Sequence, residues 1–264
     1  MSLAGKVCVV TGGSSGIGYQ TAVDLSKTGA RVCVAARREE RLKELVADMG
    51  GDAGGHSYQV TDVSDRDSVR ALAEHVRSVH GRCDVLVNNA GISTQRPFTA
   101  ESGIEDVHRV MAVNFFGAVY CTGELLPLLI DSAPSNVVNV SSMSGRIAAP
   151  GASAYSASKF ALSGWSESLH YELAEFGVCV STVEPGFIPT EGFPQRELAE
   201  DPVLRYALGS VGDVSRAIRD AIEGRKVQRV VPRWYYVLQV PRLLAPPLFR
   251  FGLTRLAAQR QRRA

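Results

Sequence analysis

Three side chains that together could hold a carbonyl oxygen and move a proton occur in order in the second half of the chain: Ser142, Tyr155 and Lys159. Tyr155 and Lys159 are four residues apart at the start of a predicted helix, so they project from one helical face and the ammonium can lie near the phenol. A nearby cation favours the phenolate and lowers the phenol pKa toward neutral pH. Ser142 follows a predicted buried strand, where its hydroxyl could hold a carbonyl oxygen. The pattern predicts proton transfer at a carbonyl or an alcohol, although a tyrosine and a lysine at this spacing also occur as two surface residues.

A glycine-rich segment, Thr11–Gly18, links the first predicted strand to the first predicted helix. Glycines at such a turn let backbone amides approach a pyrophosphate, and the helix N-terminus adds partial positive charge. The spacing TGxxxGxG therefore predicts a dinucleotide site, with a simple turn as the alternative. A small polar cluster, Asn88–Gly91, follows the fourth predicted strand, at the edge where ligands bind in such sheets; a plain turn is again the alternative. The candidate cofactor-binding residues in the two segments are Gly12, Ser14, Ser15, Gly16, Ile17, Gly18, Asn88, Ala90 and Gly91.

Short apolar runs alternate with longer amphipathic ones along most of the chain. The short runs are rich in valine and lack polar alternation, which is typical of strands buried on both faces. The repeated order strand, helix, strand predicts an α/β fold, a Rossmann-like doubly wound parallel sheet of about seven strands with helices on both faces. The predicted strands are Val7–Val10, Arg31–Ala35, Gly55–Val60, Cys83–Val87, Asn136–Val140, Val178–Val183 and Gln228–Val231. The predicted helices are Ile17–Lys27, Glu39–Met49, Arg66–Val79, Val107–Leu129, Tyr155–Phe176 and Val214–Ile222.

The bulk composition is that of one sizeable globular domain: 264 residues, 45% hydrophobic and 21% charged. The chain does not open with a basic stretch, an apolar block and a small-residue cleavage site, so we expect no secretory signal. Five scattered cysteines without CxxC or metal spacing predict reduced core cysteines in a cytoplasmic protein. The five histidines also lack metal-ligand spacing, so we expect them to be solvated and predict no metal site.

The charge is unevenly distributed, because ten of the 29 basic residues and none of the 27 acidic residues follow Gly224. We predict a catalytic domain over residues 1–232 and a basic, apolar tail over residues 233–264. Pro241, Pro246 and Pro247 interrupt helices in the tail, and no uncharged run in it approaches the roughly 18 residues that a membrane span needs. The tail could lie peripherally on the inner face of a membrane, cover the substrate pocket or form a subunit interface. Nucleic-acid binding has no supporting motif and is not expected.

In their order along the chain, these motifs resemble the short-chain dehydrogenase/reductase family, in its short single-domain branch, from Leu3 to about Pro232. The resemblance implies hydride transfer between a nicotinamide cofactor and a small-molecule carbonyl or alcohol. With such a cofactor, we expect the positive charge of the oxidised nicotinamide to act together with Lys159 in lowering the Tyr155 pKa. We also expect a homo-oligomer, either a dimer or a tetramer. The matching positions are Thr11–Gly18, Asp62, Asn88–Gly91, Asn114, Ser142, Tyr155, Lys159 and Pro185-Gly186.

The resemblance also assigns roles to single residues. It implies that Asp62, beside Val63, hydrogen-bonds the adenine and that Asn88 and Ala90 line the cofactor groove. It implies that Asn114 holds a water in a proton relay to Lys159, which also binds the ribose hydroxyls. Taken singly, Asn114 could instead be a buried helix amide and Asp62 a turn former. The remaining expected cofactor contacts are Tyr155, Pro185, Gly186 and, for the nicotinamide carboxamide, Ile188 and Thr190.

The end of the second predicted strand bears on the choice of cofactor. NAD-binding sites place an acidic residue there for the ribose hydroxyls, whereas this chain has Ala36 followed by Arg37. A guanidinium suits a 2′-phosphate, so we predict NADP(H) over NAD(H), with reduction as the direction in the cell. The alternative is that Arg37 and Arg38 merely begin a solvated helix. Ser14 stands in the glycine loop where many NADP-binding relatives have a basic residue, which weakens the prediction.

The leading hypothesis is an NADP(H)-dependent reductase of a fairly apolar ketone or acyl-thioester. The alternatives are an NAD-dependent alcohol or hydroxysteroid-type dehydrogenase and, from a different class, a non-catalytic NADP-sensing binding protein. The complete set Asn114, Ser142, Tyr155 and Lys159 disfavours the binding protein. The segment 187–212 is the expected substrate loop, with the apolar side chains Phe187, Phe193, Leu198, Leu204 and Tyr206.

Overall fold

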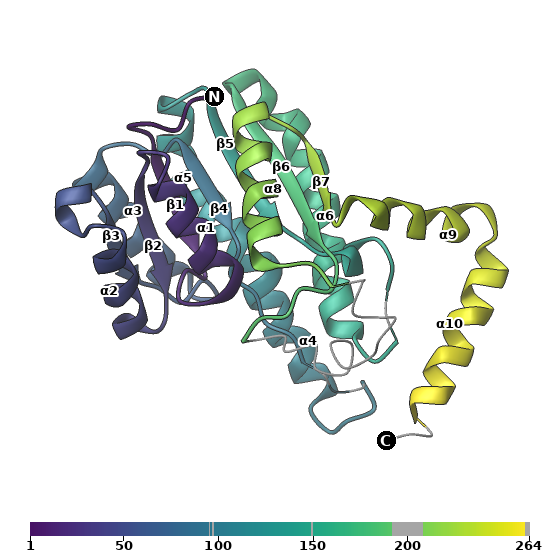
Figure 1. Cartoon of the computed structure of the whole chain (residues 1–264). Helices are drawn as coiled ribbons and strands as arrows, with labels where there is room; N and C mark the ends of the chain where they lie inside the picture. The colour runs from purple at the N-terminus through teal and green to yellow at the C-terminus, as the bar shows by residue number, and fades with distance from the viewer. Residues whose placement is uncertain (95, 97, 149, 192–207, 262–264) are drawn as a thin grey trace.

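Seven parallel strands form one sheet in the order β3-β2-β1-β4-β5-β6-β7 (Figure 1). The computed structural model describes residues 1–94, 96, 98–148, 150–191 and 208–261. This sheet confirms the predicted doubly wound α/β fold. The strands are β1 (Val7–Thr11), β2 (Arg31–Ala36), β3 (Ser57–Val60), β4 (Val85–Asn88), β5 (Ser135–Val140), β6 (Val178–Pro185) and β7 (Gln228–Val231).

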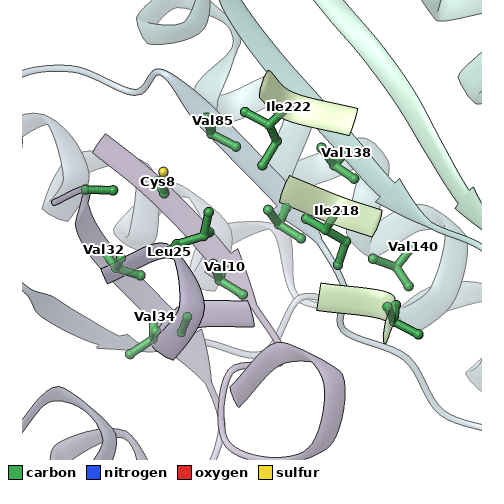
Figure 2. Packing of buried hydrophobic residues seen from close by; sticks show 14 of the residues in the cluster. Cys8, Val10, Leu25, Val32, Val34, Val85, Val138, Val140, Ile218 and Ile222 are labelled. Carbon is green, nitrogen blue, oxygen red and sulfur yellow. The ribbon is translucent and has the colours of Figure 1, made fainter. Parts of the chain in front are cut away.

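Helices cover both faces of the sheet because successive strand residues point to opposite sides. Cys8 and Val10 of β1 join one apolar cluster, whereas Val9 joins the other. Ile218 and Ile222 pack on the first cluster, above strands β1, β4 and β5 (Figure 2). The first face is covered by α1 (Gly16–Ser26), α2 (Glu39–Asp48) and α8 (Val211–Gly224). The second is covered by α3 (Arg66–His80), α5 (Gly117–Asp131) and α6 (Ser153–Leu173).

The helix predicted over Val107–Leu129 is longer and is divided into three parts. It begins with α4 (Gly103–Met111), passes through a π-helical turn, η2 (Ala112–Phe116), and continues as α5. Such a π turn adds a residue to the helix and is frequent at functional sites. By length and composition, this is the one helix of the described chain that could cross a membrane. Its most apolar stretch is 44% buried, and it packs on α3 and α6, as a core helix does.

Several polar and thiol side chains are more buried than their residue types suggest. His56 and His80 are buried, so the expectation that all five histidines are solvated is wrong for these two. The His56 ring accepts a hydrogen bond from the Val32 amide, and the His80 ring bonds the Ser57 hydroxyl at 2.8 Å, which compensates their loss of water. All five cysteines are buried and unpaired, as predicted.

After β7 the chain forms an arm that leaves the edge of the sheet and turns a corner (Figure 1). We call residues 233–261 the C-terminal arm; it comprises η6 (Arg233–Gln239), α9 (Val240–Leu244) and α10 (Pro246–Gln261). Pro246 begins α10 rather than interrupting it, because proline lacks only an amide that the first helical turn leaves unpaired. Tyr235 secures the base of the arm: its side chain is buried, and its ring lies directly against Gly186, where any side chain would overlap it.

Asp84 joins the amino ends of β1 and β4. Its fully buried carboxylate accepts hydrogen bonds from Lys6 Nζ at 2.9 Å, the Val7 amide at 2.9 Å and Arg82 Nε at 2.7 Å. Burial raises the pKa of this carboxyl, but the bonds from Arg82, Lys6 and Val7 outweigh it and hold the pKa below its ordinary value. Because the Asp84 pKa is lower in the folded state than in the unfolded state, ionised Asp84 stabilises the fold at pH values above the unfolded-state pKa. This stabilisation is lost as the pH falls through the folded-state pKa.

We therefore expect Asp84→Asn to lower the free energy of unfolding at neutral pH by about 1.5 to 3 kcal/mol, because the partly exposed cations Lys6 and Arg82 lose charge-assisted hydrogen bonds to the buried carboxylate. The difference from the unmodified protein should shrink below about pH 4, near the unfolded-state pKa of aspartate. Urea denaturation across this pH range measures both effects. The matched control is Asp67→Asn, whose exposed carboxylate pairs only with Arg70 and should change stability by less than about 1 kcal/mol. Equal stabilities of the two variants at neutral pH would contradict the assigned role of Asp84.

Candidate active site

A cleft of about 770 Å³ opens at the carboxyl ends of the strands. It begins at the glycine loop after β1, passes the ends of β2 and β4, and reaches the residues that follow β5 and β6. Leu238 and Leu253 of the C-terminal arm also line it. Of the predicted site residues, Gly12, Ser14, Ser15, Gly16, Ile17, Arg37, Asp62, Val63, Ala90, Gly91, Ser142, Tyr155, Lys159, Pro185, Gly186, Ile188 and Thr190 line the cleft.

Close packing shapes the glycine loop. Gly12 has φ +68°, and a Cβ there would lie 2.8 Å from Cα of Ala90. Gly18 does not line the cleft: a Cβ on it would overlap the carbonyl oxygen of Gly12, so this glycine lets α1 pack against the loop. Asn89 Nδ2 donates to the Thr11 carbonyl at 3.0 Å and thereby ties the loop to the end of β4. The loop is thus held open, with the first amides of α1 directed at the cleft.

Asn88 lies behind the cleft rather than in its wall, so its expected place in the cofactor groove is corrected. Its Nδ2 donates to Thr122 Oγ1 at 3.0 Å and to Asn139 Oδ1 at 2.9 Å, inside the protein. A strand residue points to one face or the other, and it is the next residue, Asn89, that lines the cleft. The sequence shows both asparagines side by side but not which one faces the ligand.

Arg38 is a site residue that the sequence did not single out. Its Nη2 donates to Ser15 Oγ at 2.8 Å and to Ser14 Oγ at 3.1 Å, so the guanidinium lies on the glycine loop. Its Nη1 pairs with Glu191 Oε1 at 2.7 Å, which lowers the pKa of Glu191. The only sequence signal was its place after Arg37, which is exposed and also lines the cleft.

At the end of β3, Asp62 has a fixed carboxylate. Its Oδ1 accepts bonds from the Ser64 hydroxyl at 2.6 Å and the Ser64 amide at 3.0 Å. The Ser64 hydroxyl is the main cause of a lowered Asp62 pKa, to which the charge of Arg37 also contributes. Asp62 therefore offers a polar contact at this end of the cleft, and its neighbour Val63 offers an apolar one.

Ser142, Tyr155 and Lys159 meet at the other end of the cleft. Lys159 is buried, its Nζ donates to the Val140 carbonyl at 2.8 Å, and it lies 5.7 Å from the centre of the Tyr155 ring. Ser142 follows β5 and accepts a hydrogen bond from the Ser144 amide at 3.1 Å. A further hydrogen bond joins Ser142 to the Tyr155 phenol. The three side chains that the sequence brought together by spacing are thus together in space.

The pKa values of this group differ from the expected ones. Burial raises the pKa of Tyr155 to about 12, and the hydrogen bond with Ser142 only partly opposes this. Burial also lowers the pKa of Lys159 to about 8. In the protein alone, burial thus acts more strongly on the phenol pKa than the Lys159 amine does. The expected lowering of this pKa by Lys159 together with an oxidised nicotinamide stays a prediction. At neutral pH Tyr155 is protonated and can donate a proton.

Asn114 lies in the π turn, behind the cleft wall. Its Oδ1 accepts from the Ile92 amide at 2.8 Å, and its Nδ2 donates to the Ile92 carbonyl at 2.9 Å and to Ser158 Oγ at 3.0 Å. These bonds fix the segment that follows Gly91, which lies close to Lys159. Its expected contact with a water of a proton relay stays a prediction.

The segment after β6 closes one side of the cleft. Thr190 approaches the glycine loop so closely that a Cβ on Gly16 would lie 3.2 Å from its Cγ2. Ile188 is buried beside it. Of the expected substrate loop, Phe187 lies in the cleft wall, whereas Phe193, Leu198, Leu204 and Tyr206 lie outside the described residues.

Comparison with known proteins agrees with this geometry. A family model described as short chain dehydrogenase matches residues 6–201. The chain is 37% identical over 215 residues to the 3-oxoacyl-(acyl-carrier-protein) reductase FabG of Thermotoga maritima. The aligned region covers 80% of this chain and 87% of that protein. It is 33% identical over 276 residues to dehydrogenase/reductase SDR family member 7B of Mus musculus, over 99% of this chain and 84% of that protein. A short-chain dehydrogenase/reductase from Burkholderia phymatum, crystallised in complex with NAD, matches with TM-score 0.83 at 25% identity, over 94% of this chain and 96% of that one.

The buried amine of Lys159 should make stability depend on pH. Its folded-state pKa of about 8 lies below the unfolded-state value of about 10.4, so folding expels a proton between these values and stability rises with pH across them. We expect the unfolding free energy of the unmodified protein, relative to Lys159→Met, to increase by roughly 2 to 3 kcal/mol from about pH 7.5 to about pH 10. Urea denaturation of both proteins measures the difference. Lys43→Met, at an exposed position, is the control. Parallel pH curves for Lys159→Met and the unmodified protein would contradict the prediction.

Proposed function

The chain belongs to the short-chain dehydrogenase/reductase family of oxidoreductases, which use a nicotinamide cofactor, and we propose that it reduces a carbonyl group with NADP(H). The observation that carries the proposal is a protonated phenol, Tyr155, at one end of a cleft that has two arginines, Arg37 and Arg38, at its other end. A phenol that keeps its proton at neutral pH suits a step in which an oxygen atom gains a proton.

The cleft fits a dinucleotide in shape and in donors. The open glycine loop and the N-terminus of α1 suit a pyrophosphate, and Asp62 and Val63 suit the adenine. Lys159, Ile188 and Thr190 would hold the nicotinamide half. When bound there, the nicotinamide would supply the hydride. The remaining chemistry belongs to the side chains of the chain itself.

In the proposed reduction, the Ser142 hydroxyl donates a hydrogen bond to the substrate carbonyl oxygen and holds it beside Tyr155. The Tyr155 hydroxyl then transfers its proton to that oxygen as negative charge develops on it. The charge of Lys159 stabilises the phenolate that remains, because the amine lies close to the ring. Asn114 positions the chain beside Lys159 through its bonds to Ile92.

The substrate we propose is a fairly apolar ketone or acyl-thioester. Apolar side chains line the substrate end of the cleft, namely Ile147, Phe187, Ile188, Leu238 and Leu253. The name of the Thermotoga maritima relative, a 3-oxoacyl-(acyl-carrier-protein) reductase, supports the acyl-thioester. We also propose a cytoplasmic homo-oligomer, since the five buried free cysteines suit a reducing compartment.

An NAD-linked alcohol dehydrogenase is the second candidate, because the Burkholderia phymatum structure contains NAD. Two features favour NADP(H) over it in this chain. Ala36 at the end of β2 offers no carboxylate to the ribose, and Arg38 lies on the glycine loop, where it supplies the cation that Ser14 does not. The two cofactors can be distinguished by binding alone.

We expect Tyr155→Phe to lower kcat for ketone reduction by about 10² to 10⁴-fold, because the proton donor is lost. Ser142→Ala should also be strongly impaired, because the carbonyl oxygen loses its anchor. The measurement is NADPH consumption with a panel of ketones and acyl-thioesters, after which the best substrate is used for the variants. Cofactor affinity, measured by fluorescence titration, should change less than about twofold for Tyr155→Phe. Normal turnover by this variant would remove Tyr155 from the mechanism, and a complete lack of turnover by the unmodified protein would favour the binding-protein alternative.

Arg37→Gln and Arg38→Gln should each weaken NADPH binding about tenfold or more, through loss of a charge-assisted contact to the 2′-phosphate. NADH binding should change little. The double variant Ala36→Asp/Arg37→Gln should reverse the preference, since its carboxylate repels the phosphate and bonds the ribose. Glu191→Gln should tighten NADPH binding, because it frees Arg38 from its ion pair. Arg70→Gln, on α3, is the matched control. Equal affinities of the unmodified protein for NADPH and NADH would refute the NADP(H) assignment.

A further inference from the structure

The C-terminal arm exposes large apolar side chains to solvent. Leu243 is 74% exposed, Leu244 80% and Phe251 54%, and Val237, Val240 and Leu248 are exposed as well. A run of exposed apolar residues of this extent marks an interaction surface. We propose that this surface docks on an anionic lipid bilayer.

Unpaired positive charge accompanies the apolar side chains. Among the described residues, no carboxylate lies within ion-pairing distance of the arm's arginines Arg233, Arg242, Arg250 and Arg255. By contrast, Arg229, just before the arm, pairs with Asp220 at 2.8 Å. The arm sequence has no acidic residue at all, so it cannot neutralise these cations itself. Lipid phosphates at a headgroup surface supply the missing anions.

The mixture of arginines and apolar residues distinguishes a bilayer from a second copy of the chain. The buried core of a protein interface is depleted in charge, whereas here arginines alternate with leucine and phenylalanine along α10. At a headgroup boundary the two types coexist, because the arginine stem lies among the acyl chains and the guanidinium stays with the phosphates. Arg255 stacks over the Phe251 ring at 4.4 Å, which lets both reach the boundary together. Trp234 and Tyr236 are exposed at the base of the arm, and such aromatic side chains favour this depth.

The charge of the rest of the chain fixes the orientation. Residues 1–232 carry 22 basic and 27 acidic side chains, so this body is repelled by an anionic surface that attracts the arm. The protein therefore approaches a bilayer with the arm first.

Docking in this orientation brings the catalytic cleft to the lipid. Leu238 and Leu253 of the arm line the cleft, and a second, apolar cavity of about 330 Å³ adjoins it through Leu253. This cavity lies between α9 and α10 and is lined by Pro241, Ala245, Leu248, Phe249, Gly252 and Leu253. The catalytic cleft and this cavity thus share apolar lining from the arm. Resting on the function proposed above, this shared lining assigns as substrate a lipophilic carbonyl compound dissolved in the membrane.

The test of docking is co-sedimentation of the full chain with vesicles and needs neither cofactor nor turnover. We expect binding to phosphatidylcholine vesicles that contain phosphatidylglycerol, little binding to pure phosphatidylcholine, and weaker binding as salt rises. Arg250→Gln and Arg255→Gln should each lower the partition coefficient about fivefold. The triple variant Leu243→Ser/Leu244→Ser/Phe251→Ser should lower it at least about tenfold. The matched control, Arg77→Gln/Val79→Ser on the surface of α3, should bind like the unmodified protein.

Two outcomes overturn docking. One is the absence of binding to anionic vesicles at low salt. The other is release of a subunit from a lipid-free oligomer by the triple variant, seen by analytical ultracentrifugation and without any vesicle binding, which would make the arm a subunit contact. Circular dichroism checks that each variant is folded.

The substrate assignment has its own readout. The triple variant should reduce a long-chain ketone embedded in vesicles more slowly than the unmodified protein does, and a short water-soluble ketone at the same rate. Equal loss on both ketones would overturn delivery from the membrane. If the unmodified protein bound vesicles but reduced neither ketone, the proposed function would fail while docking stood.

Discussion

In an all-parallel sheet the carboxyl ends of the strands share one edge, so the segments that follow Thr11, Ala36, Asn88, Val140 and Pro185 open into the same cleft. The parallel arrangement itself depends on burial of both faces, because each crossover helix must lie on one of them. Valine-rich strands meet this demand, and the polar residues Ser14, Arg37, Asp62, Asn89 and Ser142 of the cleft wall follow the strand ends. Residues far apart in the sequence are therefore brought to one site by the direction of the strands, and their side chains need only be held in place locally.

Burial determines the electrostatics of the catalytic group. It stabilises the neutral forms of Tyr155 and Lys159 and so moves their pKa values apart: the pKa of the phenol rises to about 12, and the pKa of the amine falls to about 8. Lys159 is held by the Val140 carbonyl, an acceptor that cannot neutralise it. Additional positive charge beside Tyr155 acts on the phenol more strongly than it would in bulk water, because the protein around this group screens charge less than water does. The pKa of Tyr155 therefore depends on the charge of the molecule that occupies the cleft.

The sequence was most informative where a single period or spacing decides the structure. Buried valine runs located all seven strands within a few residues, and the spacing of Tyr155 and Lys159 placed them on one helical face. It was less informative where a contact depends on distant residues. The π turn at Asn114 and the inward direction of the Asn88 side chain follow from packing against other elements. The hydrophobic periodicity of their own segments does not indicate this packing. Arg38 contacts Ser14 and Ser15 of the glycine loop and Glu191, which is 153 residues away, and its own segment indicates neither contact. To predict the direction of the Tyr155 pKa shift, one must know how far the side chain is buried as well as which charges lie near it.

Tyr235 joins the arm to the wall of the cleft. The ring of Tyr235 fills the space beside Gly186 that a side chain would need, and its hydroxyl hydrogen-bonds the backbone of Phe187. Gly186 and Phe187 are also part of the cleft wall, directly after β6. The packing of the arm therefore requires a glycine at position 186, and the wall of the cleft is held from outside by the first residues of the arm. A force that moved the base of the arm would be transmitted to the cleft through this ring, because the close packing between them leaves no space to absorb the displacement.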